Sequence, residues 1–132
     1  MPTRDRVETW AEAYRVDWET ADADAAAALF SEDSSYRSEI FEDPHRGRSG
    51  VAEYWTGVTS SQSDASVTMG EPFVDGDRVA VEFWTRMKVD GAPVTLAGCM
   101  LLRFADDGLC SDLREYWQFT DGDHEPPGGW GS

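Results

Sequence analysis

Near the end of the chain, one glutamate interrupts an otherwise apolar alternation. Every second residue from position 113 to position 119 is Leu113, Glu115, Trp117 or Phe119. If this stretch is a β-strand, its period of two places all four side chains on one face of a sheet. A carboxylate on an apolar face is unfavourable unless it is paired, hydrogen-bonded or protonated, and burial raises its pKa. Glu115 is therefore the first candidate for a general acid or base; the alternative is a structural glutamate held by an arginine or a tyrosine hydroxyl.

A tyrosine and an acid-rich loop are the next candidates. Tyr14 falls on the apolar face of an expected helix, where its phenol would hydrogen-bond either a ligand carbonyl or another core side chain. The loop over residues 39–46 carries three acids, an arginine and His45 around two apolar residues. Such a loop either carries chemistry at a pocket mouth or is a solvated connection that turns at Asp43-Pro44. No spacing matches a standard metal site, phosphate loop or dinucleotide loop, so we expect no metal and no cofactor.

Helices are expected to dominate the first half of the chain. Five apolar side chains fall on one face of a helix that Thr3 would cap; they are Val7, Trp10, Ala11, Tyr14 and Trp18. Ser49 would cap the third helix. The expected elements are a helix over residues 4–20, a short helix over 24–31, a strand over 34–39, a loop over 40–48 and a helix over 50–60.

The second half has the pattern of a meander of β-hairpins. Asp-Gly pairs at 75–76, 90–91 and 107–108 separate alternating runs, which is a strong hairpin signal. The expected strands cover residues 65–74, 78–89, 94–104 and 109–119. Helices followed by such strands predict an α+β fold, with three N-terminal helices packed in a strongly curved antiparallel sheet around an internal pocket. We expect one domain over residues 1–120 and an irregular C-terminal tail over residues 121–132.

Residues on the inward faces of these elements are the candidate walls of the pocket. They are Trp18, Tyr36, Ser38, Phe41, Trp55, Phe83, Met87, Met100 and Trp117. The alternative for about half of them is ordinary core packing. The outward face of the sheet still carries Trp84, Cys99, Leu101 and Tyr116, and such an apolar face predicts a homodimer.

Composition excludes several classes of partner. The 132 residues carry 26 acidic against 11 basic side chains, a net charge of −15, so nucleic acid and anionic membranes are unexpected partners. No apolar run approaches the ~20 residues of a membrane span, and the N-terminus lacks a signal core, so we expect a cytoplasmic protein with free cysteines. The acidity fits either a high-salt cytoplasm or a GC-rich genome.

Three stretches of the chain resemble the nuclear-transport-factor-2-like superfamily, in particular its SnoaL-like branch. They are AAAALFSED (25–33), YRSEIFEDPHRGRSGVAEYW (36–55) and LREYW (113–117). The resemblance implies a cone-shaped, cystatin-like α+β roll that holds a small, largely apolar molecule. It does not by itself transfer a reaction, because the superfamily includes isomerases, cyclases, epoxide hydrolases and binding proteins.

The resemblance also limits the possible chemistry. The oxyanion-hole tyrosine of ketosteroid isomerases falls on Tyr14, but their base falls on Ser38 and their protonated aspartate on Met100, neither of which can replace the carboxyl group. Similarity to SnoaL-like cyclases implies an acid–base pair, here Glu115 and His45. The Asp–Arg–Asp set of epoxide hydrolases is disfavoured, since no arginine falls on an inward face. We expect a cofactor-free isomerase, cyclase or lyase, or alternatively a non-catalytic binding or interaction domain.

Overall fold

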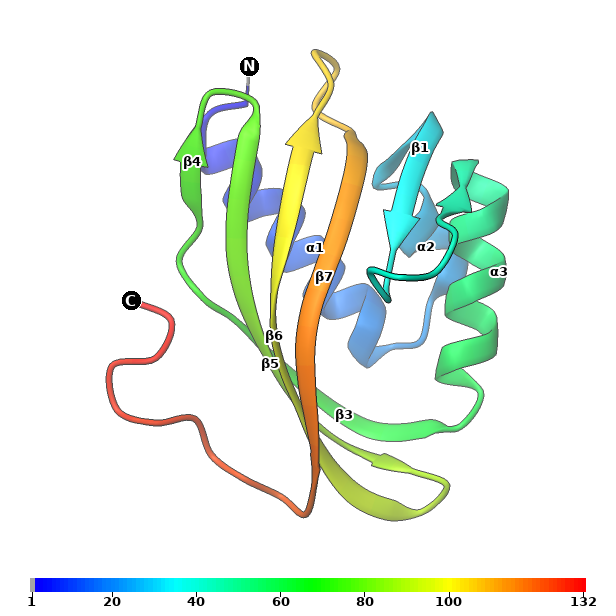
Figure 1. Ribbon diagram of the computed structural model, residues 1–132, viewed down its shortest axis with the longest axis vertical. Helices are drawn as coiled ribbons and strands as arrows, with labels where there is room; N and C mark the ends of the chain where they lie inside the picture. The colour runs from blue at the N-terminus through cyan, green and yellow to red at the C-terminus, as the bar shows by residue number, and fades with distance from the viewer. Residues whose placement is uncertain (1) are drawn as a thin grey trace.

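The computed structural model describes residues 2–132 and contains three helices and seven strands (Figure 1). The helices are α1 (Arg4–Glu19), α2 (Ala23–Ala27) and α3 (Gly47–Thr59). The strands are β1 (Phe30–Arg37), β2 (His45–Arg46), β3 (Gln62–Met69), β4 (Phe73–Asp75), β5 (Arg78–Val89), β6 (Ala92–Phe104) and β7 (Cys110–Asp121). The α+β prediction is thus confirmed. None of the described helices is long and apolar enough to cross a membrane.

Helix α1 forms as its pattern predicts. The Thr3 side chain accepts a hydrogen bond from the Arg6 amide at 3.2 Å, and the five predicted apolar side chains are buried. The cap satisfies one amide that the helix cannot. Trp10 also donates its indole N–H to the Leu29 carbonyl at 2.9 Å, which ties the helix to the start of β1.

Two predicted helix boundaries are wrong. Helix α2 ends at Ala27, because β1 already begins at Phe30. Helix α3 starts at Gly47 rather than at residue 50, so Ser49 is not its cap. Gly47 has a φ of +68°, and a Cβ there would lie 2.9 Å from the Glu32 carbonyl oxygen. Only glycine tolerates this close left-handed turn.

The sheet is mixed, which corrects the prediction of a purely antiparallel one. Its strand order is β2-β1-β7-β6-β5-β3, with β4 paired to β5, and β1 runs parallel to β7. The other pairs are antiparallel. The last strand therefore lies between β1 and the hairpin meander, which brings residues from the two ends of the chain together.

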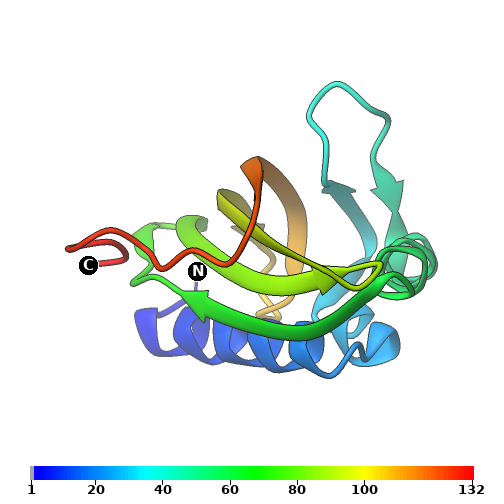
Figure 2. The same cartoon turned by 90° about the horizontal axis from the view of Figure 1, so that it is seen from below.

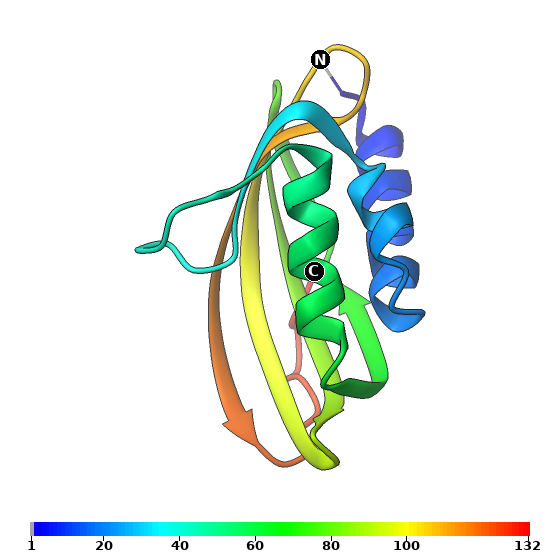
Figure 3. The same ribbon diagram turned by 90° about the vertical axis from the view of Figure 1, so that its right-hand side faces the viewer.

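The helices cover the concave face of the curved, unclosed sheet (Figures 2 and 3). Gly98 in β6 permits close packing on this face, because a Cβ there would lie 2.7 Å from both the Phe83 Cζ and the Tyr116 carbonyl oxygen. Phe83 in turn contacts Trp18 of α1, with ring centroids 5.7 Å apart. The sheet and α1 thus share one core.

The residues after Asp121 turn back at the end of β7 and run beside the sheet on its β5–β3 side (Figure 1). Trp84 donates its indole N–H to the His124 carbonyl at 2.9 Å and packs against Trp130. Arg86 pairs with Asp123, with Nη2 and Oδ2 2.9 Å apart. Part of the outer face that the sequence left open is therefore covered by the chain's own tail.

Candidate functional site

The carboxylate of Glu115 lies in a cluster with two tyrosines. Tyr36 donates its phenol proton to Glu115 Oε1 at 2.8 Å, and Tyr14 donates to the same oxygen at 3.2 Å. The two phenol oxygens are 3.1 Å apart. All three residues are buried, and Glu115 is only 7% exposed. A hydrogen bond to a tyrosine hydroxyl is the arrangement given above as the structural alternative for Glu115, and here it comes from two tyrosines.

Three distant elements build this cluster. Tyr14 comes from α1, Tyr36 from β1 and Glu115 from β7. The parallel register sets Tyr36 beside Leu113, two residues before Glu115, so that both polar side chains reach the concave side. Met100 lies opposite Glu115 on β6 and supplies an apolar neighbour.

Burial dominates the electrostatics of the cluster. Desolvation raises the pKa of Glu115 to about 7, although the hydrogen bonds from Tyr36 and Tyr14 oppose the shift by stabilising the carboxylate. Burial, followed by the negative charge of Glu115, raises the pKa of both Tyr14 and Tyr36 well above that of a free tyrosine. The tyrosines therefore remain proton donors while Glu115 titrates near neutral pH.

Glu115 opens into a cavity of about 200 Å³. Its lining is mainly aromatic and aliphatic; it consists of Tyr14, Trp18, Tyr36, Tyr54, Trp55, Val58, Gln62, Met87, Val89, Leu96, Glu115, Trp117 and Phe119. Trp117 and Phe119 are 40% and 51% exposed, so the cavity reaches solvent beside them. A partly open, mostly apolar cavity with few polar groups is the usual form of a small-molecule site.

Seven of the predicted site residues lie together in this cavity. They are Tyr14, Trp18, Tyr36, Trp55, Met87, Glu115 and Trp117. Phe83 and Met100 are instead fully buried in the core. Core packing is the ordinary alternative for an apolar residue on an inward face.

The prediction for Phe41 is wrong. Its side chain is fully exposed, because the segment between β1 and β2 extends away from the helices and the sheet (Figure 3). An apolar residue in an irregular loop has no periodicity to say which way it faces.

Ser38 and His45 lie behind the cavity wall rather than in it. The Ser38 carbonyl accepts the indole N–H of Trp117 at 2.6 Å, and its hydroxyl hydrogen-bonds Tyr54. The His45 ring packs on Tyr54, with centroids 4.6 Å apart, and lines a shallow groove on the other side of α3. Both residues thus position aromatic walls, and no direct contact joins His45 to Glu115 within residues 2–132.

The sequence interpretation missed six lining residues. They are Tyr54, Val58, Gln62, Val89, Leu96 and Phe119. Tyr54 and Val58 share the inward face of α3 with Trp55, so their helical spacing carried a usable signal. The sequence around Gln62 carried no such signal. Its side chain is held at the cavity because Oε1 accepts a hydrogen bond from the Trp18 indole N–H, with Nε1 and Oε1 3.0 Å apart.

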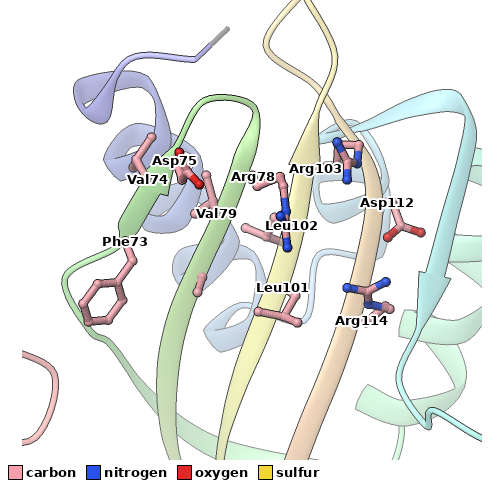
Figure 4. A pocket seen from close by; sticks show the side chains of 11 residues that line it. Phe73, Val74, Asp75, Arg78, Val79, Leu101, Leu102, Arg103, Asp112 and Arg114 are labelled. Atoms are coloured by element: carbon pink, nitrogen blue, oxygen red, sulfur yellow. The ribbon is translucent and has the colours of Figure 1, made fainter.

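A second hollow, of about 300 Å³, lies on the outer face of the sheet (Figure 4). It combines the exposed ring of Phe73 with Leu101 and three arginines, Arg78, Arg103 and Arg114. Arg114 buries an Nε–H that has no acceptor in the described part of the chain. We take the smaller cavity as the candidate active site, because it holds Glu115, a buried carboxyl group whose pKa is raised by desolvation to about 7.

The sequence and the fold of this chain are similar to those of known proteins. The model of the SnoaL-like domain family matches residues 7–112. The chain belongs to the SnoaL-like domain family. The match ends before Glu115, so membership establishes the fold and leaves the role of that carboxylate to the geometry. A search of the curated proteins finds no match.

Three solved structures illustrate the range of this fold. A hypothetical protein with a ketosteroid isomerase-like fold from Catenulispora acidiphila, solved with trimethylamine, is 20% identical; the alignment covers 81% of this chain and 83% of that one, with a TM-score of 0.73. The epoxide hydrolase/cyclase-like enzyme SalBIII, described for pyran ring formation in the polyether salinomycin, is 20% identical (89% and 96% covered, TM-score 0.76). An LEH-like epoxide hydrolase of Mycobacterium tuberculosis is 19% identical (86% and 84% covered, TM-score 0.71). At these identities the likeness shows the shared cone fold and no common reaction.

Proposed function

We propose that this protein binds a small, largely apolar molecule in the 200 Å³ cavity and catalyses a proton transfer on it with Glu115. The observation that carries the proposal is a buried carboxyl group, with a pKa of about 7, that opens into an otherwise apolar cavity. A group that titrates near working pH is suited both to take up and to release a proton. Many isomerase, cyclase and lyase reactions include such a step.

The hydrogen bonds support a separate proposed role for each member of the cluster. Tyr14 and Tyr36 occupy Oε1, so Oε2 is the oxygen that would take a proton from a substrate C–H or O–H group. The same oxygen would later return the proton to another atom of the substrate. Tyr14 would also be able to turn toward a substrate oxygen and stabilise its developing charge, as a phenol of high pKa remains a donor.

The relatives support cofactor-free chemistry but not one particular reaction. Solved structures of similar fold include an epoxide hydrolase/cyclase-like enzyme and an LEH-like epoxide hydrolase. The cavity of this chain, however, is lined by no arginine and no aspartate among residues 2–132. The paired acids and arginine of the epoxide hydrolase pattern are thus missing, and a reaction driven by one carboxyl group fits better. No three histidine, cysteine or acidic side chains of the described chain cluster as a metal site.

The test is an NMR titration of the side-chain carboxyl carbons. The variant Glu115→Gln assigns the Glu115 signal, and Glu53→Gln, at an exposed position of α3, is the matched control. We expect Glu115 to titrate near pH 7, well above an ordinary glutamate at ~4.3. Tyr36→Phe should raise that pKa further, and more than Tyr14→Phe, because the Tyr36 hydrogen bond is the shorter of the two. An ordinary or lowered pKa for Glu115 would contradict the proposed enzymatic function.

A non-catalytic role remains the second candidate, and the outer hollow favours one form of it. A second copy of the chain suits that surface, since its apolar centre around Leu101 is bordered by arginines and by Asp75 and Asp112. A two-fold axis would set basic groups of one copy against acidic groups of the other. We therefore propose a homodimer through the part of the outer face that the tail leaves open.

A further inference from the structure

We infer that the molecule held in the cavity is an organic cation, a substituted amine or quaternary ammonium group on a small apolar body. This inference rests on the proposed function, because it names the ligand class of the same cavity. Three independent features carry it: the unpaired oxygen of Glu115, the aromatic walls and the acidity of the whole chain.

The first feature is a carboxylate without a counter-charge. Glu115 Oε2 accepts no hydrogen bond from residues 2–132, and no lysine, arginine or histidine lines the cavity. The titratable groups that face Glu115 are phenols, namely Tyr14 from α1, Tyr36 from β1 and Tyr54 from α3. The facing position on β6 is Met100. A buried negative charge is strongly unfavourable without a positive partner, and a cationic ligand would supply one.

The second feature is the set of rings around that carboxylate. Trp18, Trp55, Trp117, Tyr54 and Phe119 line the cavity. Trp18 and Trp55 pack edge to face against each other, with ring centroids 5.5 Å apart and planes at 78°, and both border the cavity. Aromatic rings attract cations electrostatically, most strongly where water is excluded, and a cage of several rings recognises alkylated ammonium groups.

The third feature is the long-range field and the size of the space. A net charge of −15 attracts cations and repels anions at a distance. A cavity of about 200 Å³ lies below the ~300–1,000 Å³ of sites that take drug-sized ligands. A trialkylammonium group with a short substituent fits these limits better than a polycyclic substrate.

The experiment compares two probes of the same shape. Choline carries a quaternary nitrogen where 3,3-dimethylbutan-1-ol carries a neutral carbon, so their binding differs through charge. By isothermal titration calorimetry at pH 8, where Glu115 is ionised, we expect choline to bind at least about tenfold more tightly, which is the effect of a desolvated cation–π and ion-pair contact. Equal binding of the two probes, or no binding of choline, would overturn the inference.

Two variants locate the effect. Glu115→Gln should abolish the preference for choline, and Trp117→Leu should weaken choline binding. Trp84→Leu, on the outer face, is the matched control and should leave choline binding unchanged. A preference that survives Glu115→Gln would also overturn the inference. The wild-type comparison of the two probes does not depend on how well any variant folds.

The outcomes separate this inference from the proposed function. If the protein binds choline no more tightly than 3,3-dimethylbutan-1-ol while Glu115 titrates near pH 7, the proposed ligand class is wrong and the acid–base proposal stands. If Glu115 titrates as an ordinary glutamate, the acid–base proposal fails whichever probe binds. Affinity for choline should also fall as the pH drops below 7, because protonation removes the counter-charge.

Discussion

Glu115 is held in the folded protein at a cost in stability that varies with pH. Its pKa rises from 4.5 to about 7 on folding, so between these values the folded chain binds more protons than the unfolded one. The free energy of unfolding must then decrease as pH rises through this range. The contribution of the protonated group is complete below pH 4.5 and lost above about pH 7.

Replacing Glu115 with glutamine should remove this dependence. From pH 5 to pH 8, the free energy of unfolding of the variant should increase by about 2–3 kcal/mol relative to that of the wild type, as measured by urea unfolding. Glu53→Gln, which removes the same charge from an exposed site, should run parallel to wild type. A constant difference between Glu115→Gln and wild type at all pH values would contradict a raised pKa.

Single side chains were predictable where a period fixed their direction. The alternation of β7 placed Glu115 and Trp117 on the concave face, and the spacing of α1 placed Tyr14 and Trp18 opposite them. Phe41 was not predictable, because its loop has no period. The partnership of Tyr36 with Glu115 was also hidden, since it depends on a contact across 79 residues.

At the scale of elements, the local signals predicted the hairpins well and the long-range pairing badly. The Asp-Gly turns mark the ends of β5, β6 and β7 to within a few residues. The parallel pairing of β1 with β7 leaves no trace in either strand's own sequence, because a period of two is common to both pairing directions. For the same reason, the order of the strands had to come from the structure.

Close packing under β6 makes Gly98 a sensitive position. Gly98→Ala should lower the free energy of unfolding by about 1–3 kcal/mol, since the added Cβ meets Phe83, the Tyr116 carbonyl and Trp117 at less than 3 Å. Gly57→Ala in α3 is the matched control; its Cβ meets nothing within 4 Å, and helix propensity predicts a gain of about 0.5–1 kcal/mol. Thermal or urea unfolding measures both, and a neutral Gly98→Ala would show that β6 has room to shift.

On the scale of the whole molecule, the proposed dimer makes the outer face testable. Leu101→Asp places a charge in the centre of the outer hollow and should convert a dimer to a monomer in sedimentation equilibrium. Val16→Asp is the control, because that side chain is exposed on α1, on the opposite side of the sheet from the hollow, and the change should leave the mass unchanged. A wild-type protein that sediments as a monomer would exclude the dimer.

The parallel partnership of β1 and β7 also has a consequence for synthesis on the ribosome. After β1 leaves the exit tunnel, more than 70 further residues must be translated before β7 can pair with it, which takes roughly 4–15 s at ~5–20 residues per second. During that interval β1 has an unpaired edge, and unpaired edges promote aggregation. The nascent chain therefore has a period of vulnerability that its finished structure conceals, and a chaperone that shields the emerging N-terminal half would act in that interval.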